Sequence, residues 1–386
     1  MTDASLMTDA ELLERLVAFD TTSRLSNLPL ADFVSAYLDR PAVRVEKMHS
    51  QDGAKANLII RTGPDREDGE GLTLSGHMDV VPADEPEWRF APFALTRAGE
   101  TYVGRGTADM KGFLALVINR VARSEPSRLR RPLALLLTYD EEVGTLGARR
   151  FAENQSVPRD LPRDVIIGEP TSLRVVRLHK GMIRLQLAFR GRAAHSGYPH
   201  LGRNAIEPAA RAIAALAGLR VVMEAERPPH GEYFPDVPYP ALNVGVVSGG
   251  SAVNVIPDRC TVQVGIRLLP EMKAEQMTAR VHAAVAEALP GEPFELASLG
   301  ESPAMMLDER AALYRELCGM VGQHGTESVA FATDAGWLQT VGFRCAIFGP
   351  GSIEVAHRPN ESLPIAEFER AGELLDDIIR RRCLAE

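Results

Sequence analysis

Histidines and carboxylates recur in this chain at the points where apolar, strand-like runs end. His77 and Asp79 follow the run "LTLSG" and flank one methionine, and Glu141 and Glu142 follow "LALLLTYD". In a strand, residues i and i+2 point to the same side, so His77 and Asp79 could act together. Imidazole and carboxylate are ligands for zinc, cobalt or manganese, and a carboxylate can also serve as a general base. The first chemistry that these residues indicate is therefore metal binding.

Three further segments carry side chains of the same kind. Asp109 lies in "GRGTADMKG", Glu169 follows "VIIG", and His357 lies in "GPGSIEVAHRPNE". In open α/β sheets, ligands bind beyond the carboxyl ends of the strands, so all these segments could deliver polar groups to one place. So many ligands exceed the three that hold a single catalytic zinc, but they suit two ions that share a carboxylate. Each residue taken alone is more often a cap, a turn residue or a solvated group; their coincidence favours a two-metal site.

The runs that would position these residues alternate between strand and helix. Residues 132–140 and 164–170 are short apolar runs without alternation, typical of buried strands, and residues 110–122 have a helical pattern. This rhythm predicts an α/β fold with a mostly parallel twisted sheet flanked by helices. From residue 181 the chain alternates strictly between apolar and polar residues, which is typical of antiparallel strands. We therefore expect a catalytic domain formed by residues 1–180 and 295–386, with an α+β domain, 181–294, inserted into it.

Composition and charge narrow the class of protein. The net charge of −9 argues against nucleic acid or an anionic membrane as partner. No apolar run approaches the roughly 18 residues of a membrane span, and the acidic N-terminus lacks a signal pattern. The cysteines are too far apart for a thiolate metal site, so we expect reduced thiols and a cytoplasmic protein. They are Cys260, Cys318, Cys345 and Cys383.

The motifs as a set resemble a known family. "SGHMDVVP", "GRGTADMKG", "DEEVGTLGA", "GEPT", "AHSG" and "AHRPNE" are similar to those of the aminoacylase/carboxypeptidase family of dinuclear zinc hydrolases, in order and from about residue 8 to 380. "GEPTSLRVVRLHKG" and "GPGSIEVAHRPNE" resemble its deacetylase branch in particular. The resemblance implies a zinc-peptidase-like catalytic domain with an inserted lid or dimerisation domain. It also implies hydrolysis of a small N-acyl amino acid: removal of acetyl from Nα-acetyl-L-ornithine to give ornithine and acetate, in arginine biosynthesis.

The family pattern assigns a metal role to five side chains. His77 and Glu169 would hold one ion, Glu142 and His357 would hold the other, and Asp109 would bridge both. The expected cofactor is two divalent ions, Zn²⁺ by ligand type, with Co²⁺ able to substitute.

The remaining catalytic roles also come from the resemblance. Glu141 would be the general base, and Asp79 would hydrogen-bond the ring of His77. The resemblance further implies a cis peptide bond between Asp109 and Met110. Because a carboxylate partner fixes the tautomer of a metal-bound histidine, the expected role of Asp79 would explain why it stands beside His77.

Three residues of the inserted domain also match family positions. His195, in "RAAHSGYP", would reach the active site of the partner subunit and help to hold the oxyanion, so the resemblance implies a homodimer. Asn254 and Arg267 would contact substrate, with Arg267 on its α-carboxylate. On the residues alone, Asn254 is equally compatible with a turn, and Arg267 with a solvated strand end.

Several alternatives stay open at this point. Succinyl-diaminopimelate desuccinylases, general aminoacylases and carboxypeptidases would share every metal ligand, and the sequence does not separate their substrate pockets. A metal-binding scaffold without catalysis is disfavoured because Glu141 is present. A serine or cysteine hydrolase is disfavoured because the sequence has no GxSxG motif and no cysteine in a motif with histidine.

Overall fold

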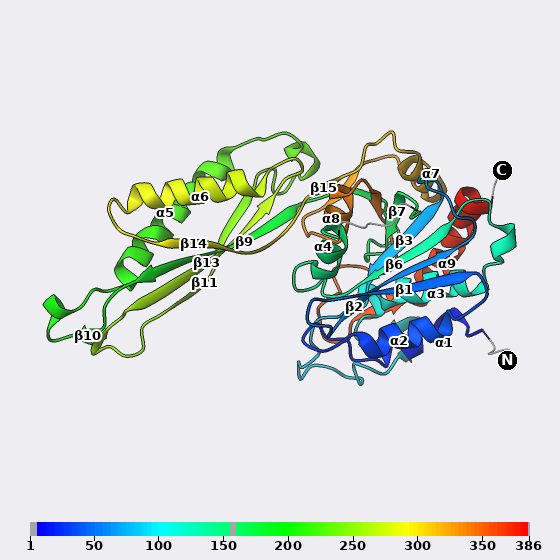
Figure 1. Ribbon diagram of the computed structural model, residues 1–386, viewed down its shortest axis with the longest axis horizontal. Coiled ribbons are helices and arrows are strands. Elements are labelled where there is room, and N and C mark those ends of the chain that lie inside the picture. Colours follow the sequence, from blue (N-terminus) through cyan, green and yellow to red (C-terminus); the bar gives the residue numbers. More distant parts are fainter. Residues whose placement is uncertain (1–5, 155–159, 385–386) are drawn as a thin grey trace. The chain divides into compact units, whose positions relative to one another are not determined.

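The computed structural model describes residues 6–154 and 160–384. Figure 1 shows their helices and strands, which belong to two compact units. The first unit consists of Met1–Arg177, Leu307–Glu327 and Thr333–Glu386, and the second of Leu178–Met306 and Ser328–Ala332.

The first unit is built on a sheet whose central strands are parallel. β3 (Leu72–His77) pairs in parallel with β6 (Leu133–Thr138) on one side and with β7 (Asp164–Ile167) on the other, and β7 pairs in parallel with β17 (Arg344–Ile347). All residues of β3, β6 and β7 are buried, as expected for strands covered on both faces. The predicted mostly parallel sheet is confirmed. Flanking antiparallel strands are β1 (Val43–His49), β2 (Ala56–Thr62) and β8 (Val176–His179).

Helices and one small sheet complete the first unit. α3 packs against β3 and β6, whereas α8 packs against β17. Thr8 and Glu11 form a capping box at the first helix, as their spacing indicates. The helices are α1 (Asp9–Val17), α2 (Leu28–Tyr37), α3 (Gly112–Arg123), α4 (Leu146–Ala152), α7 (Ala312–Val321), α8 (Ala335–Thr340) and α9 (Ile365–Ile379); the small sheet contains β4 (Thr96–Ala98), β5 (Thr101–Val103) and β18 (Ser362–Pro364).

The second unit contains a four-stranded antiparallel sheet. Its strands lie in the order β11 (Ala241–Gly249), β13 (Arg259–Leu268), β9 (Gly181–Arg190) and β14 (Glu295–Ser302). Because β14 pairs with β9, this unit continues beyond residue 294, where the sequence placed its end. Two short strands, β10 (Ala194–His195) and β12 (Val255–Ile256), form a separate antiparallel pair.

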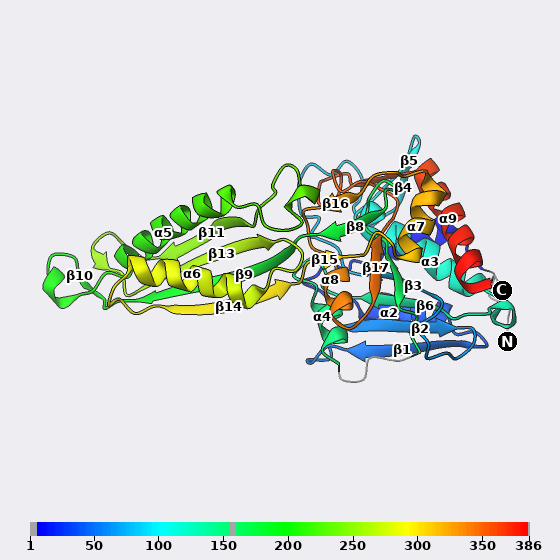
Figure 2. The ribbon, with the colours of Figure 1, turned by 90° about the horizontal axis from the view of Figure 1, so that it is seen from above.

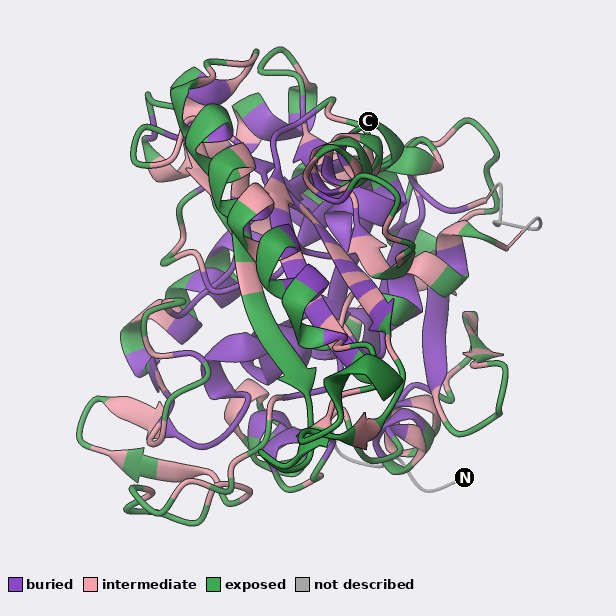
Figure 3. Ribbon diagram, turned by 90° about the vertical axis from the view of Figure 1, so that its left-hand side faces the viewer, coloured by how far each residue is buried: buried purple, intermediate pink, exposed green. Residues whose placement is uncertain are grey.

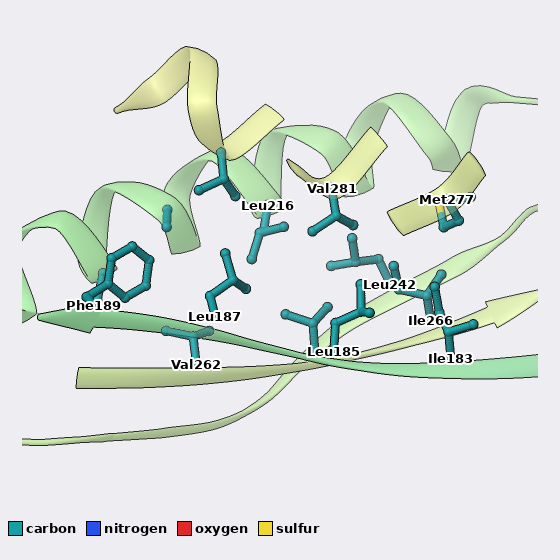
Figure 4. Packing of buried hydrophobic residues seen from close by; sticks show 14 of the residues in the cluster. Ile183, Leu185, Leu187, Phe189, Leu216, Leu242, Val262, Ile266, Met277 and Val281 are labelled. Carbon is teal, nitrogen blue, oxygen red and sulfur yellow. The ribbon is translucent and has the colours of Figure 1, made fainter. Parts of the chain in front are cut away.

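One face of this second sheet is covered by two helices, α5 (Ile206–Ala225) and α6 (Ala274–Ala288) (Figure 2). Burial alternates along β9, and its buried side chains, including Leu185 and Leu187, pack with Leu216 of α5 and Val281 of α6 (Figure 4). This is the one-sided burial that the alternating sequence predicted.

Buried and exposed residues follow the same pattern in the rest of the described chain. Figure 3 shows exposed residues in green along the outward sides of helices, and buried residues in purple beneath them.

No helix in the described ranges is both long and apolar enough to cross a lipid bilayer. The four cysteines form no disulfide in the described residues.

Candidate metal centre

The carboxyl edge of the parallel sheet gathers five metal-capable side chains. His77 is the last residue of β3, Glu169 follows β7, and Glu142 lies in the turn after β6. Asp109 lies in the turn before α3, and His357 lies in the loop that follows β17. Their ligand atoms fall into two groups, within each of which all atoms lie within 4.8 Å of one another: His77, Asp109 and Glu169 in one, and Asp109, Glu142 and His357 in the other.

Asp109 belongs to both groups and presents one oxygen to each. Its Oδ1 lies 2.9 Å from Nε2 of His77, and its Oδ2 lies 3.4 Å from Nε2 of His357. Nε2 of His357 also lies 2.9 Å from a carboxylate oxygen of Glu142. A carboxylate placed between two sets of nitrogen and oxygen ligands has the geometry required to bridge two ions.

The ring of His77 is oriented for metal binding by a backbone group. Its Nδ1 donates a hydrogen bond to the carbonyl oxygen of Asp79 at 2.9 Å, which leaves the lone pair of Nε2 directed toward Asp109. A ligand histidine normally donates its other ring N–H in this way, because the bond fixes the tautomer. The donor set therefore fits a divalent ion.

The predicted hydrogen bond from His77 to the Asp79 side chain is wrong in detail. Oδ1 of Asp79 lies 3.7 Å from Nδ1 of His77, beyond hydrogen-bonding distance. The carboxylate instead accepts from the backbone N–H groups of Glu141 at 3.1 Å and Glu142 at 3.3 Å, and from the hydroxyl of Ser23 at 2.7 Å. The reason is that β3 ends at His77, so Asp79 lies beyond the pleat and faces the turn after β6.

The acids in this cluster raise one another's proton affinity. Burial, followed by the charge of Glu169, raises the pKa of Glu141 well above its usual range. Burial, followed by the charge of Asp109, raises the pKa of Glu142 to about 7 and that of Glu169 well above its usual range. Buried carboxylates at such short distances repel each other unless cations compensate them, which again fits divalent ions.

The pKa values of the two histidines are also raised, because the neighbouring carboxylates stabilise the protonated, positively charged ring. Hydrogen bonds to Asp109 and Glu142 raise the pKa of His357 to about 10. Burial alone would lower the pKa of His77, but its hydrogen bond to Asp109 and that carboxylate's charge raise it well above the ordinary value. Both rings thus lie in a strongly negative environment, where a metal ion and a proton would compete for the same nitrogen.

The backbone at two ligands is unusual. The peptide bond between Asp109 and Met110 is cis, which confirms the expectation from the sequence. His357 has a φ of 61°, in the left-handed region that costs a non-glycine residue on the order of 1 kcal/mol or more. Such a conformation persists only where the surrounding loop determines it, and it turns this ring toward Asp109 and Glu142.

The candidate residues of the second unit lie at two ends of its sheet. His195 is exposed in β10, and the N–H of Ser196 donates to the carbonyl of Asn254 at 2.9 Å. His195 and Asn254 lie beyond the end of the sheet at which Arg259 of β13 pairs with β9. Arg267 lies near the opposite end of the same strand. Eight residues of β-strand extend about 26 Å. Within this unit, the structure therefore brings His195 and Asn254 together and leaves Arg267 apart from them.

Sequence reasoning missed two buried polar residues near the candidate groups. Asp334, at the start of α8, accepts a hydrogen bond from the hydroxyl of Thr138, and burial raises its pKa to about 6. Its charge also contributes to the raised pKa of Glu141. In the second unit, burial and the charge of Arg267 lower the pKa of His179 to about 4. In the sequence, Asp334 has the signature of an ordinary helix N-cap, so no local signal separates it from that role.

Comparisons with a family model and with known sequences point to the same family of hydrolases. The family model described as Peptidase family M20/M25/M40 matches residues 73–381. The chain is 35% identical over 384 residues to acetylornithine deacetylase from Pasteurella multocida, covering 97% of each chain. It is 33% identical to the acetylornithine deacetylase of Proteus mirabilis, covering 99% of this chain and 98% of that one.

Solved structures share the fold at lower identity. An M20 family metallo-carboxypeptidase from Sulfolobus solfataricus superposes with a TM-score of 0.77 and 18% identity, covering 97% of this chain and 99% of that one. A dinuclear metal-binding peptidase of the M20 family from Bacillus subtilis gives a TM-score of 0.67 at 15% identity, covering 96% of this chain and 97% of that one.

Proposed function

The chain belongs to peptidase family M20/M25/M40 and is a metal-dependent hydrolase that acts on amide bonds, and on that premise we propose that it removes the acetyl group from Nα-acetyl-L-ornithine. The products would be ornithine and acetate. The observation that carries the chemistry is the pair of ligand groups that share Asp109, together with the buried Glu141, which interacts electrostatically with Glu169 and His77. The choice of substrate is supported by the full-length similarity to acetylornithine deacetylases.

Two divalent ions fit the ligand set, and we propose Zn²⁺, with Co²⁺ as a working substitute. His77 and Glu169 would hold one, Glu142 and His357 the other, and Asp109 both. When bound, such ions supply a Lewis acid for the amide carbonyl and lower the pKa of water toward neutrality.

Glu141 would act as the proton carrier of the reaction. Its carboxylate would take a proton from the attacking water and then give it to the leaving amine, so that the C–N bond breaks and acetate and a free amine result. Burial, followed by the charge of Glu169, raises the pKa of Glu141, and a carboxylate with a raised pKa is a stronger base toward the attacking water. Asp79 would hold the base in place through the N–H of Glu141.

Substrate binding would use the second unit. Arg267 would form charged hydrogen bonds with the α-carboxylate, Asn254 would contact the substrate, and His195 would donate to the developing oxyanion. Because Arg267 and His195 lie at opposite ends of one sheet, they would not serve the same substrate from one chain. This supports the proposal that His195 acts in the active site of a partner subunit.

A homodimer is the oligomer that this proposal requires. In the described residues, β11 is an edge strand that pairs with β13 alone, and its Val246 and Val247 are about half exposed. An open strand edge with apolar side chains is a surface that can pair with the same strand of a second copy. We therefore propose that the protein is a homodimer. We also propose that it acts in the cytoplasm, in arginine biosynthesis.

The test is a comparison of three substrates with metal-loaded protein. Ornithine release from Nα-acetylornithine is measured beside hydrolysis of Nα-acetylmethionine and N-succinyl-diaminopimelate, each with and without chelator. The proposal expects the highest kcat/KM for Nα-acetylornithine and loss of all turnover with chelator. A higher kcat/KM for either other substrate would support an aminoacylase or a desuccinylase instead, and chelator-resistant turnover would exclude the metal mechanism.

A further inference from the structure

A buried ion pair in the first unit contacts the turn that carries Asp109 of the candidate metal centre. Nη1 of Arg105 lies 2.9 Å from Oε2 of Glu361, and each side chain is only 1% exposed. Burying two charges is costly, and the cost is offset only where further hydrogen bonds satisfy both groups. A buried ion pair often adds little to the free energy of unfolding, so stability alone does not explain why these two charges are buried together.

Glu361 uses both oxygens to hold the turn that carries Asp109. Oε1 accepts from the N–H groups of Ala108 at 2.9 Å and Asp109 at 3.0 Å. Oε2 accepts from the N–H of Gly106 at 3.0 Å in addition to the Arg105 guanidinium. One carboxylate therefore receives four donors, three of which are backbone groups immediately before or at the shared ligand.

Arg105 extends the same network to the segments that carry the two histidines. Its Nη2 donates to the carbonyl of Pro82 at 3.0 Å, on the segment that follows His77. Its Nη1 lies 3.4 Å from the carbonyl of Arg358, the residue after His357. The guanidinium also lies 5.1 Å from the ring centroid of Trp88, on the first of these segments.

We propose that Arg105 and Glu361 are positioning residues that lock together the three ligand-bearing segments 77–88, 104–111 and 357–361. Without the pair, Asp109 would no longer be held so that one oxygen faces His77 and the other faces His357. This inference rests on the metal sites of the proposed function, but not on which amide is hydrolysed. A planar guanidinium suits this task because its rigid fork of donors can reach the other two segments at once.

The test measures metal binding rather than turnover. Full-length metal-free protein is titrated with Zn²⁺ and with Co²⁺ by calorimetry, and the visible absorption of the Co²⁺ form is recorded as a report on coordination geometry. Glu361→Gln keeps the shape of the side chain but removes its charge and two of its acceptor contacts. We expect metal affinity to fall about 10–100-fold, as for other residues that orient ligands, with a changed Co²⁺ spectrum. Arg105→Lys should show a smaller loss in the same direction.

A matched control separates positioning from general destabilisation. Asp164, at the opposite end of β7 from Glu169, is 6% exposed and forms ion pairs with Arg344 and Arg382. Asp164→Asn should lower the melting temperature but leave metal affinity and the Co²⁺ spectrum unchanged. Wild-type affinity and spectrum in both Glu361→Gln and Arg105→Lys would overturn the inference, as would an equal loss of affinity in Asp164→Asn. A wild-type protein that binds neither ion would overturn the proposed function as well.

Discussion

The two units of this chain hold their candidate functional residues in different ways. In the first unit, parallel strands end at one edge, and loops from five points of the chain meet there with ligand atoms within 4.8 Å of one another. In the second unit, antiparallel strands run the length of the sheet, so His195 and Arg267 lie at its opposite ends. A parallel sheet concentrates functional groups at one edge, whereas a long antiparallel sheet distributes them.

The difference has a consequence for function. The first unit brings all its candidate groups together within one chain, so its chemistry needs no second copy to bring ligands together. The second unit separates a candidate oxyanion donor from a candidate carboxylate-binding residue, so one chain would offer each of them to a different substrate. The comparison therefore predicts that a Glu141 variant loses activity at the site of its own chain. A His195 variant should instead lose activity at the site of the partner chain.

The largest effect is expected from the proposed base. Glu141→Ala should lower kcat by about 10²–10⁴-fold, the usual contribution of a positioned general base, while both ions still bind. Turnover of Nα-acetylornithine and calorimetric metal titration check the two parts of this prediction. Near-normal turnover in the variant would remove Glu141 from the mechanism, and loss of metal binding would show that it serves as a ligand.

His195 tests whether the second unit acts across a dimer. His195→Ala should lower kcat about 10²–10³-fold, as for the loss of an oxyanion donor. Mixing this variant with Glu141→Ala and allowing the subunits to exchange should recover roughly a quarter of wild-type turnover, because about half of the dimers would then contain one chain of each variant, and each such dimer would carry one intact site of two. Each variant incubated alone serves as the control.

Failure of the mixture to recover activity, with exchange verified by differently tagged subunits, would place His195 and Glu141 in the same chain's site. A chain that stays monomeric and fully active at high dilution would exclude the dimer itself.

Arg267 should have an intermediate effect, mainly on substrate binding. Removing a charged hydrogen bond costs about 1.5–3 kcal/mol, so Arg267→Ala should raise KM roughly 10–100-fold with a smaller change in kcat. Wild type and variant are compared on Nα-acetylornithine and on its α-carboxamide, which lacks the negative charge. The wild type should prefer the carboxylate, and the variant should lose that preference. An unchanged preference would separate Arg267 from the carboxylate.

The same two regions show how far sequence reasoning reached. The gathering of the candidate ligands at the carboxyl edge was predictable, because short apolar runs precede them and the fold brings the ends of such runs together. The partner of the Asp79 carboxylate was not, because it depends on where β3 stops and on which N–H groups the next turn presents. Glu361 lies in the motif that contains His357, yet its role comes from contacts with residues more than 250 positions away. The extension of the second unit by β14 likewise depends on long-range pairing.

The smallest expected effect concerns stability and comes from Asp334, which is buried beside the acids of the first unit. Burial raises its pKa from 3.8 to about 6, so the folded protein binds this proton more tightly than the unfolded chain. The protonated carboxyl therefore stabilises the fold fully below about pH 4, and this contribution is lost as the pH rises through about 6.

Asp334→Asn removes that titration while it keeps a similar shape and an acceptor for Thr138. Between pH 4 and 7, the metal-free wild type should lose about 2 kcal/mol more unfolding free energy than the variant, which is most of the contribution expected at about 1.4 kcal/mol per unit of pKa shift. Urea unfolding of both proteins across this range checks the difference. Parallel pH profiles would show that Asp334 is ionised in the folded state from low pH, with its charge compensated by a donor close to it. That result would make Asp334 part of the charge balance of the metal centre rather than a separate buried acid.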